Sequence, residues 1–546
     1  MKLTSLFSRA TLLSVLITLL AFNSAHAQIP TDSIVADFNE FVRLMEETHP
    51  DPYTNYGGRV FFRKAVMDTR KSLIDDKVTD ANELAKRINA FLVPLHDGHT
   101  WMQTPDNSNM MTKKAAPIRF QAINDGVIVE AILSDYKELI GSKLIAIENI
   151  PVKEICDGLA QHYPSENNIG RLSNICQDRG FMVDLGKVIP NMPQDSLSYQ
   201  LLTPEGKQIN LTLPLVGLMQ IRGMSFSRPE HSNLFPGKNL AYSFVGEKKD
   251  IMYFCSQSIM DHDALKYMYD NGWDYEWSLQ RAYRSMVGDD MPADPVEAID
   301  KIPSFSGEFE KMLQEMKKNK TKNLIIDLRH NDGGFTPITI ATLYQMWGDQ
   351  YLKDQSNWGA IGAQLISPLL LKKYNTTLED FNAERHTNYQ LGDYAFEDDE
   401  MVQGEITEDV RNSFISNCMS SVKDKLMEQK GKPVYTPEHI YVLTDPGTFS
   451  AGFHYAFFLS KMGATVVGVP CMQAPNTYME VTQFELPRTK LNGSFSNALQ
   501  LFLPIDDPRA KDFYPDLMPT YEDFKRYNFD DNAIPMYLMD YIKNQK

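Results

Sequence analysis

The chain has 546 residues, a formal net charge of -17 and 43% hydrophobic residues. At this length two to four domains are expected, on a prior of about 150 residues each. The acidic balance argues against nucleic-acid or anionic-membrane binding, because both need clustered Lys and Arg.

The first segment, residues 1–27, has the pattern of a secretory signal peptide. Lys2 and Arg9 form a basic start, the apolar core follows, and Ala25-His26-Ala27 is an A-x-A cleavage site. The apolar core is shorter than the roughly 20 residues that span a bilayer. We therefore expect a periplasmic or secreted protein without a retained membrane anchor.

Residues 28–112 are predicted to form a small helical domain. Apolar residues recur there at helical spacing. Asp80 and Glu83, three residues apart, predict a capping box at the start of the third helix. The predicted helices cover 34–45, 60–73 and 80–92.

Residues 113–218 change to short β-rich runs separated by Gly, Asn and Pro, which predicts a β-rich domain. Its expected strands cover 127–132, 143–147, 198–202 and 209–213.

Residues 219–546 alternate buried-type strands with helical patterns, which predicts an α/β layered domain and an α/β multi-domain chain overall. We read residues 261–300 as an insertion without an assigned role. The expected strands are 251–254, 323–328, 439–443 and 465–469, and the expected helices are 309–318, 337–347 and 451–462.

The five cysteines are too few and too scattered for a disulfide framework. Cys156 and Cys176 are candidates for a disulfide, but we expect the cysteines to be small buried hydrophobic residues instead. No C-x-x-C or H-E-x-x-H pattern occurs in the sequence, so no metal site and no cofactor are predicted.

The strongest local signal is a strand, a Pro-Gly turn and then Ser450 at the start of a helix. A nucleophile benefits from this position, because unpaired N–H groups and partial positive charge stabilise a developing oxyanion. A serine there can also be a simple N-cap, so other features must decide.

Two remote segments carry further signals. The strand at 323–328 ends in Gly333-Gly334, which lets backbone N–H groups turn toward a ligand. Asp97-Gly-His99-Thr100 closes the helical domain and supplies a histidine in a loop. Taken singly, each has an ordinary structural explanation, a turn or a surface residue.

Together these segments resemble the tail-specific or C-terminal-processing serine peptidases, which include the core domain of tricorn protease. The matching elements are Asp97-Gly-His99-Thr100, Leu324 to Gly334, Thr448 to Gly452 with Thr465 to Gly468, and Tyr514-Pro-Asp516. The resemblance implies a PDZ-like β-rich domain and a ClpP/crotonase-like α/β peptidase core. It also implies that Gly141 to Val152 is the carboxylate-loop region of the PDZ-like module.

The resemblance implies Ser450 as the nucleophile, with the N–H of Ala451 and of Gly333 or Gly334 as the oxyanion hole. Many relatives use a lysine beyond the following strand, but 470–476 contains none. Lys461 lies about three helical turns from the serine, roughly 16 Å along the axis. His99 is therefore the better general base, since its ordinary pKa of about 6.5 suits neutral pH.

An orienting acid for His99 is left open by the sequence. The tricorn-like branch has a Glu before its Pro-Asp segment, whereas this chain offers Asp506, Asp507 or Asp512 there. Asp97 is the more local candidate, although a turn role also fits it.

The predicted function is an exported serine-type endopeptidase that acts on peptides or proteins and favours free C-termini. Two alternatives remain: a catalytically silent peptide-binding protein on the same scaffold, and a serine esterase. The esterase elbow needs glycine two residues before the serine, where this chain has Thr448.

Overall fold

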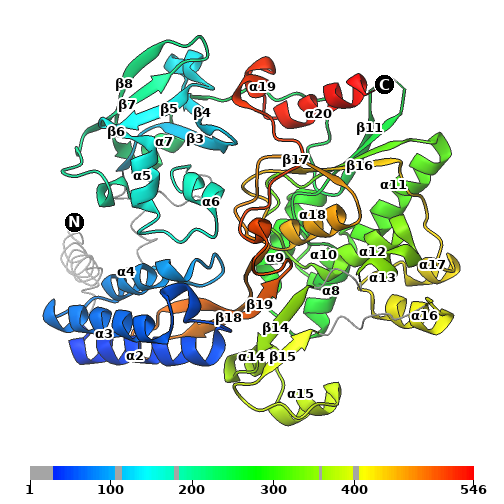
Figure 1. The fold of residues 1–546 in the computed structure, drawn as a ribbon, viewed down its shortest axis with the longest axis horizontal. Helices are drawn as coiled ribbons and strands as arrows, with labels where there is room; N and C mark the ends of the chain where they lie inside the picture. Colours follow the sequence, from blue (N-terminus) through cyan, green and yellow to red (C-terminus); the bar gives the residue numbers. More distant parts are fainter. Residues whose placement is uncertain are drawn as a thin grey trace, which may run out of the picture.

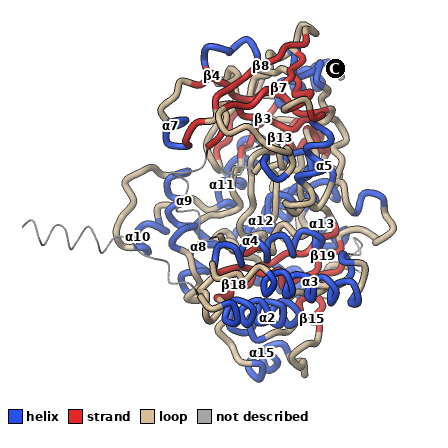
Figure 2. Tube along the Cα trace, turned by 90° about the vertical axis from the view of Figure 1, so that its left-hand side faces the viewer, coloured by secondary structure: helices blue, strands red, loops and turns tan. Residues whose placement is uncertain are grey.

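The computed structural model describes residues 29–104, 114–176, 184–246, 248–355, 360–397 and 405–545. The predicted signal peptide, residues 1–27, lies outside the described residues. Figures 1 and 2 both show the β-rich unit above the helical unit, and Figure 1 shows the α/β core beside the two.

The centre of the core is a five-stranded sheet made of β11 (Ala241–Val245), β12 (Ile251–Cys255), β13 (Asn323–Asp327), β16 (His439–Thr444) and β17 (Thr465–Gly468), in that order. β11 is antiparallel to β12, and the other neighbours are parallel. The carboxyl ends of β12, β13 and β16 therefore share one edge, so the loops that follow these strands meet there.

Alternate residues of these strands enter two different hydrophobic cores. Met252 and Leu324 pack with the helices on one face, whereas Tyr253 and Ile325 face the core shared with the β-rich unit. Burial on both faces explains why the strands read as continuous apolar runs. The helices of the first face include α11 (Phe305–Asn319), α12 (Pro337–Trp347) and α18 (Ala451–Lys461).

The predicted insertion at 261–300 forms three helices that pack on the same hydrophobic core as α11 and α12. These are α8 (His262–Asp270), α9 (Glu276–Met286) and α10 (Pro295–Asp300). Further helices at the outer side of the core are α13 (Asp349–Gln355), α16 (Glu408–Asn417) and α17 (Lys423–Glu428).

The β-rich unit is one sheet of order β10-β4-β5-β7-β8, with β3 on β4 and β6 on β5. It extends beyond the predicted boundary at 218, because β10 pairs with β4. Its elements are β3 (Ile118–Ile123), β4 (Gly126–Leu133), β5 (Lys143–Ile147), β6 (Ile150–Pro151), α5 (Val152–Leu159), α6 (Asn168–Ser173), β7 (Ser196–Leu202), β8 (Gln208–Pro214) and β10 (Phe226–Ser227). Beside it lie β2 (Lys114–Ala115), its partner β9 (Val216–Gly217) and α7 (Leu218–Arg222).

The helical unit is completed by a hairpin from the far end of the chain. Phe484 and Phe495 pack among the apolar side chains of its three helices, so the predicted unit 28–112 is not self-contained. The helices are α2 (Thr31–Thr48), α3 (Arg59–Asp75) and α4 (Ala81–Leu92). The sheet beneath them is β1 (Trp101–Met102), β19 (Asn492–Leu501), β14 (Ile361–Leu365) and β15 (Tyr394–Glu397), with β18 (Asn476–Glu485) on β19 and with α14 (Pro368–Lys373) and α15 (Leu378–Arg385) nearby.

The C-terminal helices α19 (Tyr521–Arg526) and α20 (Ala533–Asn544) share the hydrophobic core of the β-rich unit, beside which Figure 1 shows them. Phe529, between them, packs on Gly141, and Tyr521 donates a hydrogen bond to the Gly141 carbonyl. The Gly141 and Ser142 N–H groups donate to Val129 and Leu139 carbonyls. Two N–H groups of the expected carboxylate loop are therefore engaged within the protein, and Phe529 packs on its first glycine.

Several local predictions can be compared with the structure directly. Asp80 caps α4 through Asn82 N–H, but Glu83 pairs with Arg87 instead of completing a capping box. The five cysteines are buried. Within the described ranges, no helix has both the length and the apolar character needed to cross a membrane.

The packing of Phe529 on Gly141 predicts a specific loss of stability. A Cβ at Gly141 would lie 2.2 Å from Phe529 Cδ2, and φ there is +77°. Gly141→Ala should therefore cost about 1–3 kcal/mol for overlap, in addition to backbone strain. Gly206→Ala is the matched control, since its φ is +83° and nothing lies within 4 Å of the added Cβ. Equal losses of Tm in the two variants would contradict this packing.

Candidate active site

Ser450 has a backbone conformation that an ordinary N-cap does not adopt. It precedes α18 with φ +52° and ψ -127°, and its side chain makes no capping hydrogen bond. A non-glycine residue at such angles is strained by about 1–3 kcal/mol and persists only when its surroundings fix it. Neighbouring groups do so: Phe449 N–H donates to the Asn331 carbonyl, and Ser450 N–H donates to Gln473 Oε1 at 2.5 Å.

The Gly333-Gly334 turn lies directly against the serine. A Cβ at Gly333 would lie 2.7 Å from Ser450 Cβ and 2.9 Å from the Ala451 nitrogen, so no side chain fits. Ala451 is the first residue of α18, so its N–H has no acceptor within the helix. Gly333 N–H already donates to Asn331 Oδ1 at 3.0 Å, which favours Gly334 as the second donor of an oxyanion hole.

His99 lies beside the nucleophile segment, although 350 residues separate it from Phe449 in the sequence. The two rings stack with centroids 4.9 Å apart and an interplanar angle of 26°. Asp97 Oδ1 accepts the His99 backbone N–H at 2.8 Å and lies 4.0 Å from His99 Nδ1. The structure thus brings together the three segments that carry Ser450, Gly333-Gly334 and His99.

The four candidate acids differ clearly in position. Asp506 is exposed, Asp507 bonds to Arg509, and Asp512 Oδ1 accepts Asn168 N–H at 3.4 Å. Asp97 is buried beside His99.

Asp97 is held in its charged form by a second histidine. Its Oδ2 lies 3.3 Å from His49 Nε2. Burial alone would raise the pKa of Asp97, but the hydrogen bond and charge of His49, with His99 nearby, hold that pKa below its ordinary value. An ionised Asp97 can stabilise a protonated His99, which is the role of an orienting acid.

Glu166, from the loop before α6, is a partly buried acid that the sequence analysis did not select. Its Oε1 accepts Gly98 N–H at 3.1 Å, and its Oε2 accepts Ala474 N–H at 2.9 Å. Burial raises the pKa of Glu166 to about 8, and the charge of Asp97 adds to the shift. Neither hydrophobic periodicity nor motif spacing in its Ser-Glu-Asn-Asn segment identifies Glu166 as a site residue. Its hydrogen-bond partners come from two other parts of the chain.

Ligand atoms of Asp97, His99 and Glu166 all lie within 4.8 Å of one another. The carboxylates are already engaged, Asp97 with His49 and with its own turn, and Glu166 with two backbone N–H groups. This bonding is that of a hydrogen-bonded acid–base cluster rather than of a metal centre.

His454 is a second residue that the sequence analysis did not select. It lies four residues after Ser450, and its backbone N–H donates to the Ser450 carbonyl at 2.9 Å. Its Nδ1 lies 2.9 Å from Thr336 Oγ1, and its Nε2 lies 3.5 Å from Gln473 Nε2. Burial and the neighbouring His99 lower the pKa of His454 to about 4, so the ring is neutral at pH 7.

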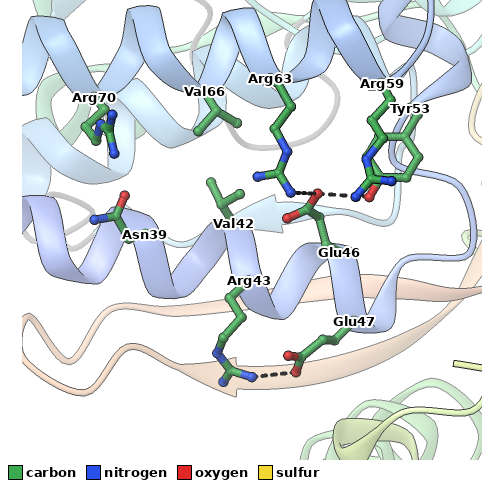
Figure 3. Close-up of a pocket in the computed structure, with 10 residues that line it drawn as sticks. All are labelled: Asn39, Val42, Arg43, Glu46, Glu47, Tyr53, Arg59, Arg63, Val66 and Arg70. Atoms are coloured by element: carbon green, nitrogen blue, oxygen red, sulfur yellow. Dashed lines mark hydrogen bonds and ion pairs between the residues drawn. The ribbon is translucent and has the colours of Figure 1, made fainter. Parts of the chain in front are cut away.

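Two cavities lie on the helical side of the molecule. One groove of about 540 Å³ runs between α2 and α3 and is lined by charged side chains such as Arg43, Glu46 and Arg63, as Figure 3 shows. Arg43 pairs with Glu47, and Arg63 pairs with Glu46. The second, of about 850 Å³, lies between α2 and the edge strand β15 and reaches His49, the partner of Asp97.

An ion pair ties the serine loop to the glycine-turn loop. His330 Nδ1 lies 2.7 Å from Asp445 Oδ2, and His330 N–H donates to Asp445 Oδ1 at 2.9 Å. The Asp445 charge raises the pKa of His330 to about 9. Burial opposes ionisation of Asp445, but His330 lowers its pKa to about 2.

This ion pair predicts a pH-dependent contribution to stability. The raised pKa of His330 means that the contribution is complete below the ordinary value of 6.5 and is lost as pH rises through about 9. His330→Asn, which tolerates the residue's φ of +60°, should lower Tm at pH 6 and much less at pH 10. Because 68% of the His330 side chain is exposed, screening limits the effect to about 1 kcal/mol. A Tm difference that is the same at both pH values would contradict this assignment.

The model of Peptidase family S41 matches residues 298–490, which include Gly333, Gly334 and Ser450 but not His99. A search of curated proteins finds no match.

Solved structures match along nearly the whole chain. A CPAF mutant has 14% identity and a TM-score of 0.51, covering 92% of this chain and 96% of that chain. Mature CPAF has 15% identity and a TM-score of 0.50, covering 91% and 95%. The photosystem II D1 C-terminal processing protease has 10% identity and a TM-score of 0.37, covering 90% and 94%. At these identities the CPAF likeness shows a shared fold.

The family match agrees with the resemblance that the sequence motifs predicted. The motifs at 324–334 and 448–452 both lie inside the matched segment. Residues 298–490 match the model of Peptidase family S41, and the chain is a serine-type peptidase.

Proposed function

We propose that this protein is an exported serine endopeptidase that cleaves peptides or proteins through an acyl-enzyme on Ser450, with His99 as general base. The observation that carries the proposal is the strained Ser450 backbone, fixed against the Gly333 turn and next to a histidine stacked on Phe449. A simple helix cap would need neither the strain nor the neighbours.

The reaction begins when His99 takes the Ser450 proton and the serine oxygen attacks the peptide carbonyl carbon. The resulting oxyanion accepts hydrogen bonds from Ala451 N–H and a glycine-turn N–H. The C–N bond then breaks, and the leaving amine takes the proton from His99. Water, deprotonated by His99, hydrolyses the ester, and the serine regains its proton.

Asp97 fits the role of the acid that stabilises protonated His99. Its carboxylate lies 4.0 Å from His99 Nδ1 and is kept ionised by His49. Lys461, the nearest lysine in the sequence, instead lies in the last turn of α18 with its Nζ over the Phe457 ring. These positions support a histidine base over a lysine base.

Export is the part of the proposal that rests on the sequence alone. Residues 1–27 carry the basic start, apolar core and cleavage pattern of a signal peptide. We propose that the mature protein begins at Gln28 and works outside the cytoplasm.

The nucleophile assignment predicts labelling by a fluorophosphonate probe. Wild-type protein should form a covalent adduct, Ser450→Ala should form none, and His99→Ala should label about 10²- to 10⁴-fold more slowly. Intact-mass spectrometry of each protein checks this. An unlabelled wild type would instead support the silent binding protein, and hydrolysis of esters but no peptides would support the esterase.

The packing of the Gly141 loop changes the expectation about substrate termini. Because the Gly141 and Ser142 N–H groups are engaged and Phe529 packs on Gly141, we infer that these two groups do not hold a terminal carboxylate. Matched peptides with free and amidated C-termini should therefore have kcat/KM values within about twofold of each other. A loss of about tenfold in kcat/KM on amidation would contradict this expectation and would indicate a site for the terminal carboxylate elsewhere in the protein.

A further inference from the structure

The loop at residues 165–168 of the β-rich unit touches both halves of the candidate active site. His96 Nδ1–H donates to the Ser165 carbonyl at 2.9 Å, on the side of the His99 turn. Asn167 Nδ2–H donates to the Cys471 carbonyl at 2.8 Å, on the side of the core. Glu166 lies between these two contacts.

The Glu166 carboxylate links the segments that carry the nucleophile and the base. Its Oε2 binds the N–H of Ala474, and the preceding residue, Gln473, accepts the Ser450 N–H. Its Oε1 binds the N–H of Gly98, and the next residue is His99. One side chain thus connects two backbone segments that come from distant parts of the sequence.

The space at Gly98 shows how closely these groups are packed. A Cβ at Gly98 would lie 2.8 Å from Glu166 Oε1 and 2.9 Å from Phe449 Cζ. The turn that carries His99 is therefore confined between the Glu166 carboxylate and the ring that precedes Ser450. A small displacement of Glu166 would move this turn.

We propose that Glu166 is a positioning residue through which the β-rich unit holds the His99 turn against the Ser450 segment. This inference rests on the proposed function of Ser450 and His99. It assigns to the β-rich unit a part in assembling the catalytic groups, separate from any part in binding substrate. Two N–H donors from two segments give the carboxylate this bridging role.

The charges around Glu166 give the proposal a measurable signature. Asp97 and His99 face it from the turn, and the Thr477 hydroxyl faces it from β18. Below pH about 8 the carboxyl is neutral, because burial raises its pKa to about 8. Above that pH its negative charge adds to that of Asp97 and stabilises protonated His99 in the transition state. The wild-type kcat/KM should therefore rise a second time near pH 8.

The test compares Glu166→Ala, Glu166→Gln and the control Glu154→Gln, an exposed glutamate of the same unit, for peptide hydrolysis across pH 5–10. Glu166→Ala should lower kcat about 10²-fold with little change in KM. Glu166→Gln has the same shape but cannot ionise, so it should lower kcat about tenfold and lose the inflection near pH 8. Glu154→Gln should match wild type.

The outcomes separate this inference from the proposed function. If wild type forms no fluorophosphonate adduct, the proposed function itself fails. If wild type is active and Glu166→Gln keeps the wild-type kcat and the inflection near pH 8, the positioning role is overturned. Thermal unfolding of each variant identifies folding defects, and if Glu166→Ala does not fold, the pH profile of the isosteric Glu166→Gln decides.

Discussion

The active-site region depends on keeping the backbone of Ser450 in a conformation that its own chemistry disfavours. The positive φ of this residue costs about 1–3 kcal/mol, and the loop alone has no means to compensate. The compensation comes from the Asn331 carbonyl, from Gln473 and from the tie between His330 and Asp445. The glycine turn and the following strand are therefore as necessary to the nucleophile as its own helix.

The parallel sheet makes this arrangement possible because it is buried on both faces. Parallel register brings the loops after β13 and β16 to one edge. One face packs on α11, α12 and α18, and the other joins the core of the β-rich unit. The β-rich unit is thus attached through a shared hydrophobic core, which gives Glu166 a fixed base from which to reach the His99 turn.

The sequence predicted those strands and helices that depend only on the local pattern of residues. The strands of the core and helices such as α12 and α18 were found because apolar period and turn residues specify them without reference to partners. Ser450, His99 and the glycine pair were selected because each has a recognisable local motif, and the structure brings their segments together. Glu166 was missed because its importance comes only from two distant N–H groups. The hairpin that completes the helical unit was missed for the same reason: Phe484 and Phe495 reach this unit from the other end of the chain.

That closing hairpin also sets an order for assembly. The buried Asp37 of α2 accepts hydrogen bonds from Arg488 and Thr489 N–H, more than 450 residues later in the sequence. Contacts of such long sequence separation form late, because closing the intervening chain is entropically costly. His99 is made early, but the sheet that supports its turn is complete only when β19 has been synthesised. A nascent or truncated chain that ends before β19 therefore lacks the strand that pairs with β1, directly after the His99 turn.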